Sequence, residues 1–168
     1  MLRIGVISDT HGEEQLICRA VEIFKELNVE RIIHCGDLCV PSQVELFREI
    51  PTDFVYGNCD SCVRLSIAQA VEKYGGTHHG DFGSLRLAGK NIAFLHGQDR
   101  TRLLQELQCG NWDLLCYGHT HRYEYSLEGE TVLLNPGSVK RRYESSCAVC
   151  VELPKIDVTR IMLEGGFY

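Results

Sequence analysis

The sequence has no apolar run of the length that a membrane-spanning helix requires. The run at its start, Met1 to Ser8, is too short for a signal peptide and leads directly into Asp9. We therefore expect a cytoplasmic protein with no membrane partner. Nine cysteines agree better with a reducing compartment than with a disulfide framework, because an odd number cannot all pair within one chain.

Basic residues are not in excess either. The chain has 17 Lys and Arg against 23 Asp and Glu, which gives a net charge of −6. Proteins that bind nucleic acid over a broad surface normally carry an excess of positive charge. The composition therefore argues against broad, non-specific binding of nucleic acid and leaves only local basic patches open.

No repeat, low-complexity segment or linker interrupts the chain, so residues 1–168 are expected to form a single domain. A chain of 168 residues can bury a continuous core without help from disulfides or a structural metal. Its composition, 44% hydrophobic and 24% charged, is close to the average for globular proteins.

The first third of the chain alternates strand-like runs with helical ones. We predict strands at Leu2–Ser8, Arg31–His34 and Thr52–Tyr56, and helices at Glu13–Leu27 and Pro41–Glu49. Each predicted strand ends in a polar turn. This order predicts a mostly parallel sheet whose polar turns gather at its carboxyl edge, where open α/β sheets bind ligands.

The rest of the chain predicts a second, more antiparallel sheet. A hairpin is expected around Ala88-Gly89-Lys90, followed by a helix at Thr101–Leu107 and a strand at Trp112–Tyr117. Further strand-like runs lie at Tyr123–Leu127, Thr131–Leu134, Cys147–Leu153 and Ile156–Leu163. The expected fold class is α/β: a two-sheet sandwich, one sheet mixed and largely parallel and the other more antiparallel, flanked by helices.

Oxygen- and nitrogen-donating side chains lie just beyond the ends of the predicted strands. They are Asp9, His11, Asp37, Asn58, His96, His119 and His121. In an extended chain residues two apart project to the same side, so each Asp-x-His or His-x-His pair could face a common centre. Imidazole and carboxylate together suit Mn, Fe, Zn, Co or Ni better than Ca or Mg. The structural alternative is that the aspartates cap the helices that follow them.

The same residues fall in ordered motifs that resemble those of the calcineurin-like metallophosphoesterase superfamily. The motifs are Asp9-Thr10-His11, Gly36-Asp37, Gly57-Asn58-Cys59-Asp60, His96-Gly97 and Gly118-His119-Thr120-His121. Further along, Asn135-Pro136-Gly137-Ser138 resembles a segment of the small single-domain phosphodiesterases of bacteria and archaea. That subgroup is the one the chain resembles most.

The resemblance implies a site with two divalent metal ions, Mn first, with Ni, Co, Fe or Zn as alternatives. By that resemblance one metal is held by Asp9, His11 and His121, the other by Asn58, His96 and His119, and Asp37 bridges both. A hydroxide that bridges the metals would then attack phosphorus in line, with no covalent enzyme intermediate. The implied activity is hydrolysis of a small-molecule phosphodiester.

Cys59 departs from the superfamily pattern. Many members carry His at this position, beside an acidic residue that here is Asp60, and that His is thought to protonate the leaving group. A thiol with an ordinary pKa of about 8.5 is a poorer proton donor than imidazole at neutral pH. We therefore expect activated aryl diesters to be better substrates than alkyl ones. Cys59, Asp60 and His96 are the candidate catalytic residues.

Two other features have competing interpretations. The basic cluster of Lys140, Arg141 and Arg142 could bind a second phosphate or a short nucleic acid, or could be a solvated turn. The C-x-x-C pairs that begin at Cys59 and Cys147 could suggest a zinc ribbon or a redox pair. Their wide separation does not fit a ribbon, and neither pair is assigned a role.

Two further functions compete with the phosphodiesterase. One is a non-catalytic metal-binding scaffold of the same fold, as a eukaryotic membrane-trafficking relative is thought to be, and the other is a small nuclease. The complete ligand set favours an enzyme, because a scaffold has no need of seven metal-binding side chains. Homo-oligomers are also expected, through strand edges after His121.

Overall fold

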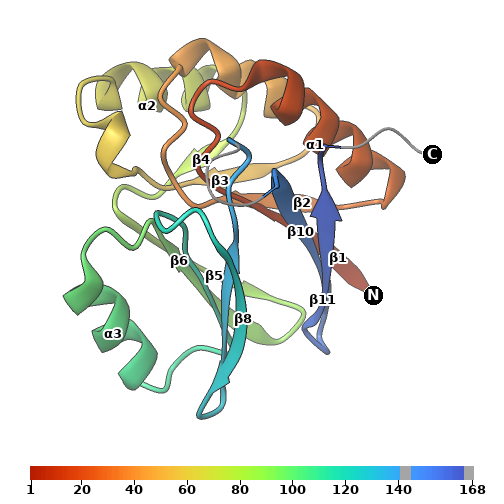
Figure 1. Ribbon diagram of the computed structural model, residues 1–168, viewed down its shortest axis with the longest axis vertical. Helices are drawn as coiled ribbons and strands as arrows, with labels where there is room; N and C mark the ends of the chain where they lie inside the picture. The colour runs from red at the N-terminus through yellow and green to blue at the C-terminus, as the bar shows by residue number, and fades with distance from the viewer. Residues whose placement is uncertain (141–144, 165–168) are drawn as a thin grey trace.

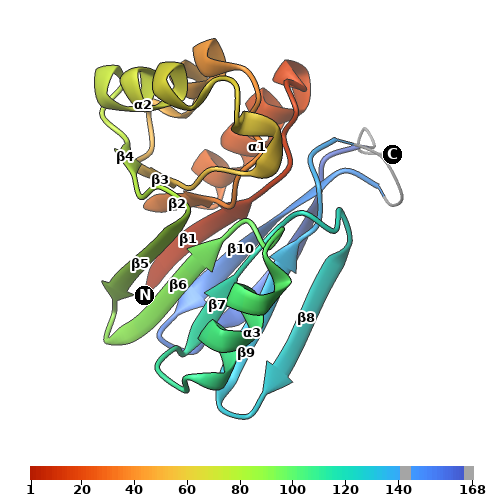
Figure 2. The same ribbon diagram turned by 90° about the vertical axis from the view of Figure 1, so that its left-hand side faces the viewer.

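The computed structural model describes residues 1–140 and 145–164. Two mixed sheets pack against each other, and helices cover their outer faces (Figure 1 and Figure 2). The predicted fold class is therefore confirmed. Within the described ranges, no helix has both the length and the apolar character needed to cross a membrane.

The first sheet has six strands in the order β11-β10-β1-β2-β3-β4. Four of its strands are parallel, and each pairs with the next: β1 (Leu2–Ile7), β2 (Arg31–His34), β3 (Thr52–Phe54) and β4 (Thr77–His78). On the other side of β1 lie β10 (Cys147–Leu153) and β11 (Asp157–Met162), each antiparallel to its neighbour.

The second sheet has five strands in the order β5-β6-β7-β9-β8. Its central strands β6 (Lys90–Leu95), β7 (Leu114–Cys116) and β9 (Thr131–Pro136) are parallel. The outer strands β5 (Phe82–Leu87) and β8 (Tyr123–Glu128) are antiparallel to their neighbours. The carboxyl ends of the parallel strands in both sheets lead into the loops that carry the predicted ligands.

Helices cover both outer faces. On the first sheet lie α1 (Glu14–Glu26), the 3-10 helix η1 (Pro41–Phe47) and α2 (Arg64–Lys73), and on the second lies α3 (Arg100–Gln108). A short 3-10 turn, η2 (Asn58–Asp60), forms within the third motif. Apolar residues from β1, β2, β10, β6, β7 and β9 form the core between the two sheets.

Several details differ from the prediction, among them strand β4, which was not expected. The two last strand-like runs belong to the first sheet, because β10 pairs with β1 from Leu2↔Leu153 to Val6↔Val149. The segment from Pro41 is a 3-10 helix whose Gln43 N–H bonds to the Val40 carbonyl, three residues back. Helix α2 was not predicted at all.

Candidate metal centre

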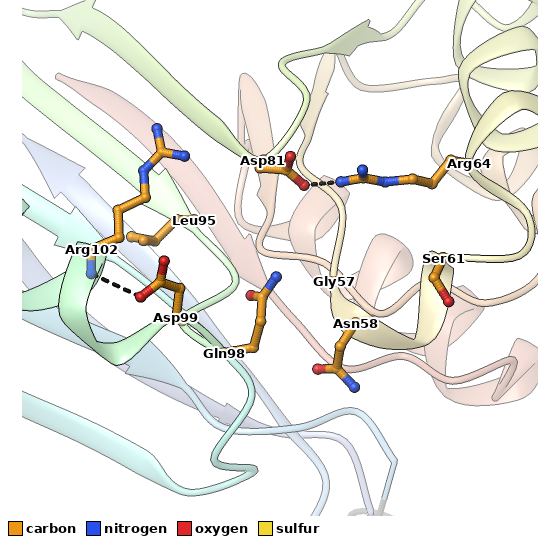
Figure 3. Close-up of a pocket in the computed structure, with 10 residues that line it drawn as sticks. Gly57, Asn58, Ser61, Arg64, Asp81, Leu95, Gln98, Asp99 and Arg102 are labelled. Carbon is orange, nitrogen blue, oxygen red and sulfur yellow. Dashed lines mark hydrogen bonds and ion pairs between the residues drawn. The ribbon is translucent and has the colours of Figure 1, made fainter.

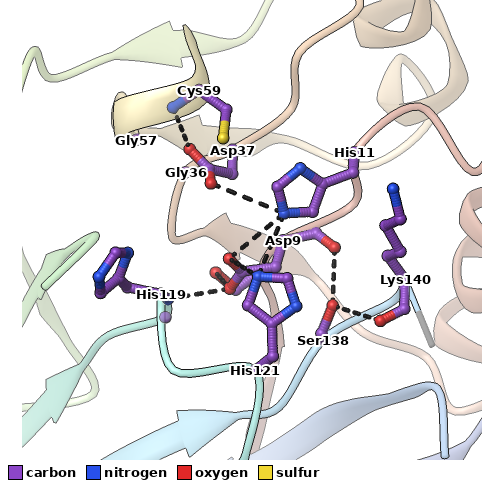
Figure 4. Close-up of polar contacts among 12 residues, drawn as sticks. Asp9, His11, Gly36, Asp37, Gly57, Cys59, His119, His121, Ser138 and Lys140 are labelled. Carbon is purple, nitrogen blue, oxygen red and sulfur yellow. Dashed lines mark hydrogen bonds and ion pairs between the residues drawn. The ribbon is translucent and has the colours of Figure 1, made fainter. Parts of the chain in front are cut away.

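Loops from both sheets bring all seven predicted ligands together. Asp9, His11, Asp37 and Asn58 follow strands β1, β2 and β3 of the first sheet, and the three remaining histidines follow β6 and β7 of the second. Figure 4 shows several of these side chains directed at one another. Short distances connect the whole set, so the sequence prediction of a single cluster agrees with the geometry.

Asp9 lies at the centre of the cluster and is fully buried. Its Oδ2 accepts hydrogen bonds from Ser8 Oγ (2.6 Å) and from the backbone N–H of His119 (3.0 Å). Its Oδ1 lies 3.2 Å from Nε2 of His121, 3.7 Å from Nε2 of His11 and 3.9 Å from Nε2 of His96. The protein thus holds one carboxylate oxygen and directs the other at three imidazoles.

Asp37 is arranged in the same way. Its Oδ1 accepts a hydrogen bond from the backbone N–H of Cys59 at 2.8 Å. Its Oδ2 lies 3.3 Å from Nε2 of His96 and 3.6 Å from Nε2 of His11. This one oxygen therefore faces a histidine from each of the two sheets.

The unpaired atoms of the cluster fit a metal ion. Asp9 Oδ1 and His96 Nε2 are buried and form no hydrogen bond within the described residues, and such groups are costly unless something satisfies them. His11 Nε2 and His121 Nε2 lie 3.3 Å apart, so one of them must carry a proton to bond the other unless a cation accepts both lone pairs. A cation among these atoms would satisfy all of them, and imidazole and carboxylate suit a transition metal.

Hydrogen bonds on the outer side of the cluster fix how the imidazoles point. His96 Nδ1 lies 2.8 Å from the carbonyl oxygen of Cys35. A carbonyl only accepts, so Nδ1 carries the proton and Nε2 presents a lone pair to the aspartates. On the exposed rim, His119 Nδ1 lies 3.0 Å from Asn58 Oδ1, so these two donors also converge.

Burial and neighbouring imidazoles have opposite effects on the pKa values of the two aspartates. Burial alone would raise the pKa of Asp9, but the imidazoles of His11 and His121 outweigh it and lower the pKa. The same competition, with His96 as the main neighbour, lowers the pKa of Asp37. Both side chains are therefore carboxylates at neutral pH, as metal ligands must be.

The turns that carry the predicted ligands have a left-handed backbone. The sequence argument assumed an extended chain for the Asp-x-His and His-x-His pairs, and that assumption is wrong. Positive φ values of 42° to 67° occur at five predicted ligands: Asp9, His11, Asp37, His119 and His121. Asp and His adopt this region more often than most residues do, although at some cost in strain. The members of each pair converge because the chain turns sharply between them, and not because they alternate along a strand.

The profile of the calcineurin-like phosphoesterase superfamily domain matches residues 2–155. The chain belongs to this superfamily. Membership makes phosphoester hydrolysis its class of function. The family generally uses divalent metals, and the cluster of Asp and His side chains fits such a site.

Similarity to archaeal phosphodiesterases extends over most of the chain. A phosphodiesterase of Methanocaldococcus jannaschii is 30% identical over 139 residues, which cover 81% of this chain and 83% of that protein. The solved structure of an archaeal phosphodiesterase has a TM-score of 0.90 at 26% identity and covers 96% of this chain and 99% of its own. The small archaeal phosphodiesterases are thus established relatives.

A more distant structure shares the fold alone. A variant of Vps29 from Entamoeba histolytica has a TM-score of 0.67 at 19% identity, with 96% of this chain and 99% of that chain covered.

Asp60, a candidate catalytic residue, is buried behind the site. Its carboxylate accepts hydrogen bonds from the backbone N–H groups of Gly57 (2.8 Å), Cys39 (2.8 Å) and Asp37 (3.0 Å). These bonds tie the second and third superfamily motifs together. The geometry therefore gives Asp60 a positioning role and leaves its side chain no free oxygen directed at the cluster.

Cys59 lies at the exposed rim, where a side chain could reach a substrate. Partial burial, Asp37 and Asp60 raise the pKa of its thiol to about 11. Its assignment as a proton donor stays a prediction.

Sequence reasoning missed several residues that support the cluster. Asn135 donates from Nδ2 to the Gly118 carbonyl at 2.8 Å, and Ser138 donates from Oγ to the Asp9 carbonyl at 3.0 Å. Both lie in the segment that was singled out only by resemblance. Cys39 Sγ lies 3.4 Å from His11 Nδ1, and no pattern in the sequence pointed to it.

The basic cluster is described only in part. Lys140 is exposed and lies on the His11 side of the site in Figure 4, with its backbone N–H bonded to the Asp9 carbonyl at 3.1 Å. Arg141 and Arg142 lie outside the described residues. The histidine of the second strand, His34, has no part in the cluster: it is buried and contacts Thr10 Oγ1 at 3.1 Å.

Proposed function

We propose that this chain is a dinuclear metal-dependent phosphodiesterase, which uses water to cleave a phosphodiester into a phosphomonoester and an alcohol. The observation that carries the proposal is the pair of buried, unpaired atoms Asp9 Oδ1 and His96 Nε2, at the centre of a complete set of seven donors. The similarity to proteins named as phosphodiesterases supports a diester as the substrate.

Two divalent cations, Mn²⁺ in the first place, fit the donors of the site. Asp9, His11 and His121 would hold one, and Asn58, His96 and His119 the other, with Asp37 shared between them. When bound, such cations would neutralise the phosphoryl oxygens and lower the pKa of the attacking water.

The residues around the cations have separate tasks. The Cys35 carbonyl fixes the tautomer of His96, so that its Nε2 lone pair is preformed. Asn58 is an uncharged ligand on the exposed side, and it limits the negative charge that an anionic substrate meets. Cys59 at the rim is a weak proton donor, which favours substrates whose leaving group needs no proton.

The other readings have less support. A non-catalytic scaffold would not need donors directed at a common centre. A small nuclease would need a basic surface for nucleic acid, whereas the chain carries a net charge of −6. A single domain over residues 1–168, a cytoplasmic location, and homo-oligomers through the strand edges after His121 stay our predictions.

The test is hydrolysis of bis-p-nitrophenyl phosphate by metal-stripped protein, with Mn²⁺, Ni²⁺, Co²⁺, Zn²⁺ or Mg²⁺ added back. We expect activity that requires a transition metal and that falls by at least about 100-fold in His96→Ala, because that change removes a ligand. The bound metal is counted in parallel by mass spectrometry, with two ions per chain expected.

His78→Ala is the matched control, since His78 is an imidazole outside the cluster that packs against the Tyr56 ring, with the ring centroids 3.8 Å apart. The control should keep both the metal and the activity. Two bound ions with no hydrolysis under any metal would overturn the enzyme proposal in favour of the scaffold.

A further inference from the structure

A cavity of about 480 Å³ opens beside the metal centre, between the loops of the two sheets. The polar side chains that line it include Asn58, Ser61, Asp81, Gln98, Asp99 and Arg102. Figure 3 shows Arg102 and Asp99 on one side and Asn58 and Ser61 on the other, with Gln98 between them. A cavity of this volume is in the size range of small-molecule sites.

The cavity and the metal centre share a wall. Asn58 lines the cavity, and its Oδ1 lies 3.0 Å from His119 Nδ1, both being proposed ligands of the same cation. Gly57, also in the lining, lies directly behind Asp37: a Cβ atom on it would come within 2.0 Å of Asp37 Oδ1. A phosphodiester held at the cations can therefore extend one of its two ester arms into this cavity.

The charges of the lining do not favour a second phosphate in it. Arg64 forms an ion pair with Asp81, and its guanidinium lies 4.2 Å from the centre of the Tyr56 ring. Asp99 accepts a hydrogen bond from the backbone N–H of Arg102 at 3.1 Å and so caps helix α3. Two cations and two anions leave the lining formally neutral, so the cavity suits an uncharged arm.

The remaining groups suit an arm that is polar and flat. Within the described part of the chain, the Arg102 guanidinium pairs with no carboxylate and lies 4.9 Å from the centre of the Phe82 ring. A guanidinium is planar, so it can stack on planar groups and donate hydrogen bonds at its edge. The exposed amide of Gln98 offers a donor and an acceptor, and the Nδ2 of the exposed Asn58 adds a donor.

We propose that this cavity binds one ester arm of the substrate and that this arm is a nucleoside. A nucleoside is uncharged, carries several hydrogen-bonding groups and presents a planar base, which are the properties that the lining matches. The inference rests on the proposed phosphodiesterase activity and adds the substrate class to it. Arg102 is the residue expected to select this arm.

The experiment compares two substrates with the same leaving group, thymidine 5′-(p-nitrophenyl phosphate) and bis-p-nitrophenyl phosphate. In both, water adds to phosphorus, the bond to a nitrophenyl oxygen breaks, and p-nitrophenolate leaves. Both diesters carry one negative charge, so a general change in electrostatics cancels in the ratio of their kcat/KM values. We expect Arg102→Ala to lower the thymidine-to-aryl ratio about tenfold, the scale of one stacking or charged hydrogen-bond contact.

Two further variants sharpen the result. Arg102→Lys keeps the positive charge but loses the planar guanidinium, so it should lower the thymidine-to-aryl ratio nearly as much as Arg102→Ala does. Arg86→Ala removes the same charge from the exposed part of β5, outside the cavity lining, and should leave the ratio unchanged. A ratio that Arg102→Ala does not move, while the wild type hydrolyses both diesters, would overturn the nucleoside site and leave the phosphodiesterase standing.

Binding of thymidine itself tests the cavity without hydrolysis, because thymidine has no phosphate. Its titration, followed by amide resonances in NMR spectra, should shift Ser61 and Gln98 in the wild type and not in Arg102→Ala. If the wild type hydrolyses neither diester, the phosphodiesterase proposal fails, and this titration still decides whether the cavity accepts a nucleoside. No shift at high millimolar thymidine would contradict the nucleoside assignment.

Discussion

Cys59 is the residue on which the choice of substrate depends most directly. Its side chain is exposed at the rim of the metal centre, and its backbone N–H is held by Asp37. Partial burial and two neighbouring carboxylates raise the pKa of the thiol to about 11, which makes it a poor acid for a departing alkoxide. An aryl oxide leaves without a proton, so its rate should not depend on this position.

We predict that Cys59→His raises kcat for diesters with alkyl leaving groups by about tenfold or more, because a positioned imidazole can protonate the alkoxide. Hydrolysis of bis-p-nitrophenyl phosphate should change little. Steady-state kinetics on an alkyl and an aryl diester check the contrast. Cys62→His is the control, since Cys62 is also exposed and lies outside the cluster. An equal gain in both variants, or none in Cys59→His, would exclude this position as the place for the acid.

Single residues also show which features of the site could be predicted from the sequence. The sequence singles out all seven proposed ligands because Asp, Asn and His recur at strand ends in ordered motifs. Their backbone conformation was not predictable, because the left-handed φ of residues such as Asp9 and His119 depends on contacts with distant loops. The positioning role of Asp60 was hidden for the same reason: two of the amides it binds, those of Asp37 and Cys39, lie more than twenty residues away.

At the scale of elements, the turn after β7 lies very close to the loop after β1. A Cβ atom on Gly118 would come within 1.9 Å of Ser8 Oγ and 2.7 Å of Asp9 Oδ2. These atoms belong to the network that holds Asp9 against the His119 amide. Neither loop can move away without disturbing the proposed ligands that it carries.

We therefore predict that Gly118→Ala weakens metal binding by at least about tenfold, the effect expected when the support of a ligand is disturbed. Isothermal titration with Mn²⁺ measures the affinity. Gly129→Ala is the control, because a Cβ there meets no atom within 4 Å and the positive φ of 65° adds only local strain. That variant should lose about 1 kcal/mol of stability and keep the affinity. Equal affinities in both variants would show that the close approach does not matter.

Helix α2 and the pairing of β10 with β1 show why some features of the fold were not predicted. Only Ile67 and Val71 of α2 are buried, and no side chain caps its start after Val63, so the usual signals of an amphipathic helix are weak. The strand at Cys147–Leu153 was predictable from its apolar residues, but its partner was not. Pairing of β10 with β1 joins opposite ends of the chain, and local patterns carry no information about such contacts.

On the scale of the whole molecule, the proposed cations connect the two sheets. The first sheet contributes Asp9, His11, Asp37 and Asn58, and the second contributes His96, His119 and His121. Without a cation, the buried atoms Asp9 Oδ1 and His96 Nε2 face each other at 3.9 Å with no hydrogen bond. Metal binding should therefore stabilise the packing of one sheet on the other, in addition to providing the chemistry.

This coupling predicts that Mn²⁺ raises the melting temperature of the metal-stripped protein. A free concentration 100-fold above Kd stabilises the folded state by about 2.7 kcal/mol per site. At about 2–4 °C per kcal/mol for a chain of this size, one site should raise Tm by about 5–10 °C. Differential scanning calorimetry with excess chelator, and then with Mn²⁺, measures the shift. His78→Ala should keep it and His96→Ala should lose most of it, because only the second variant removes a donor that the second sheet offers to a shared cation. An equal shift in both variants would mean that Mn²⁺ stabilises the fold from somewhere other than the junction of the two sheets.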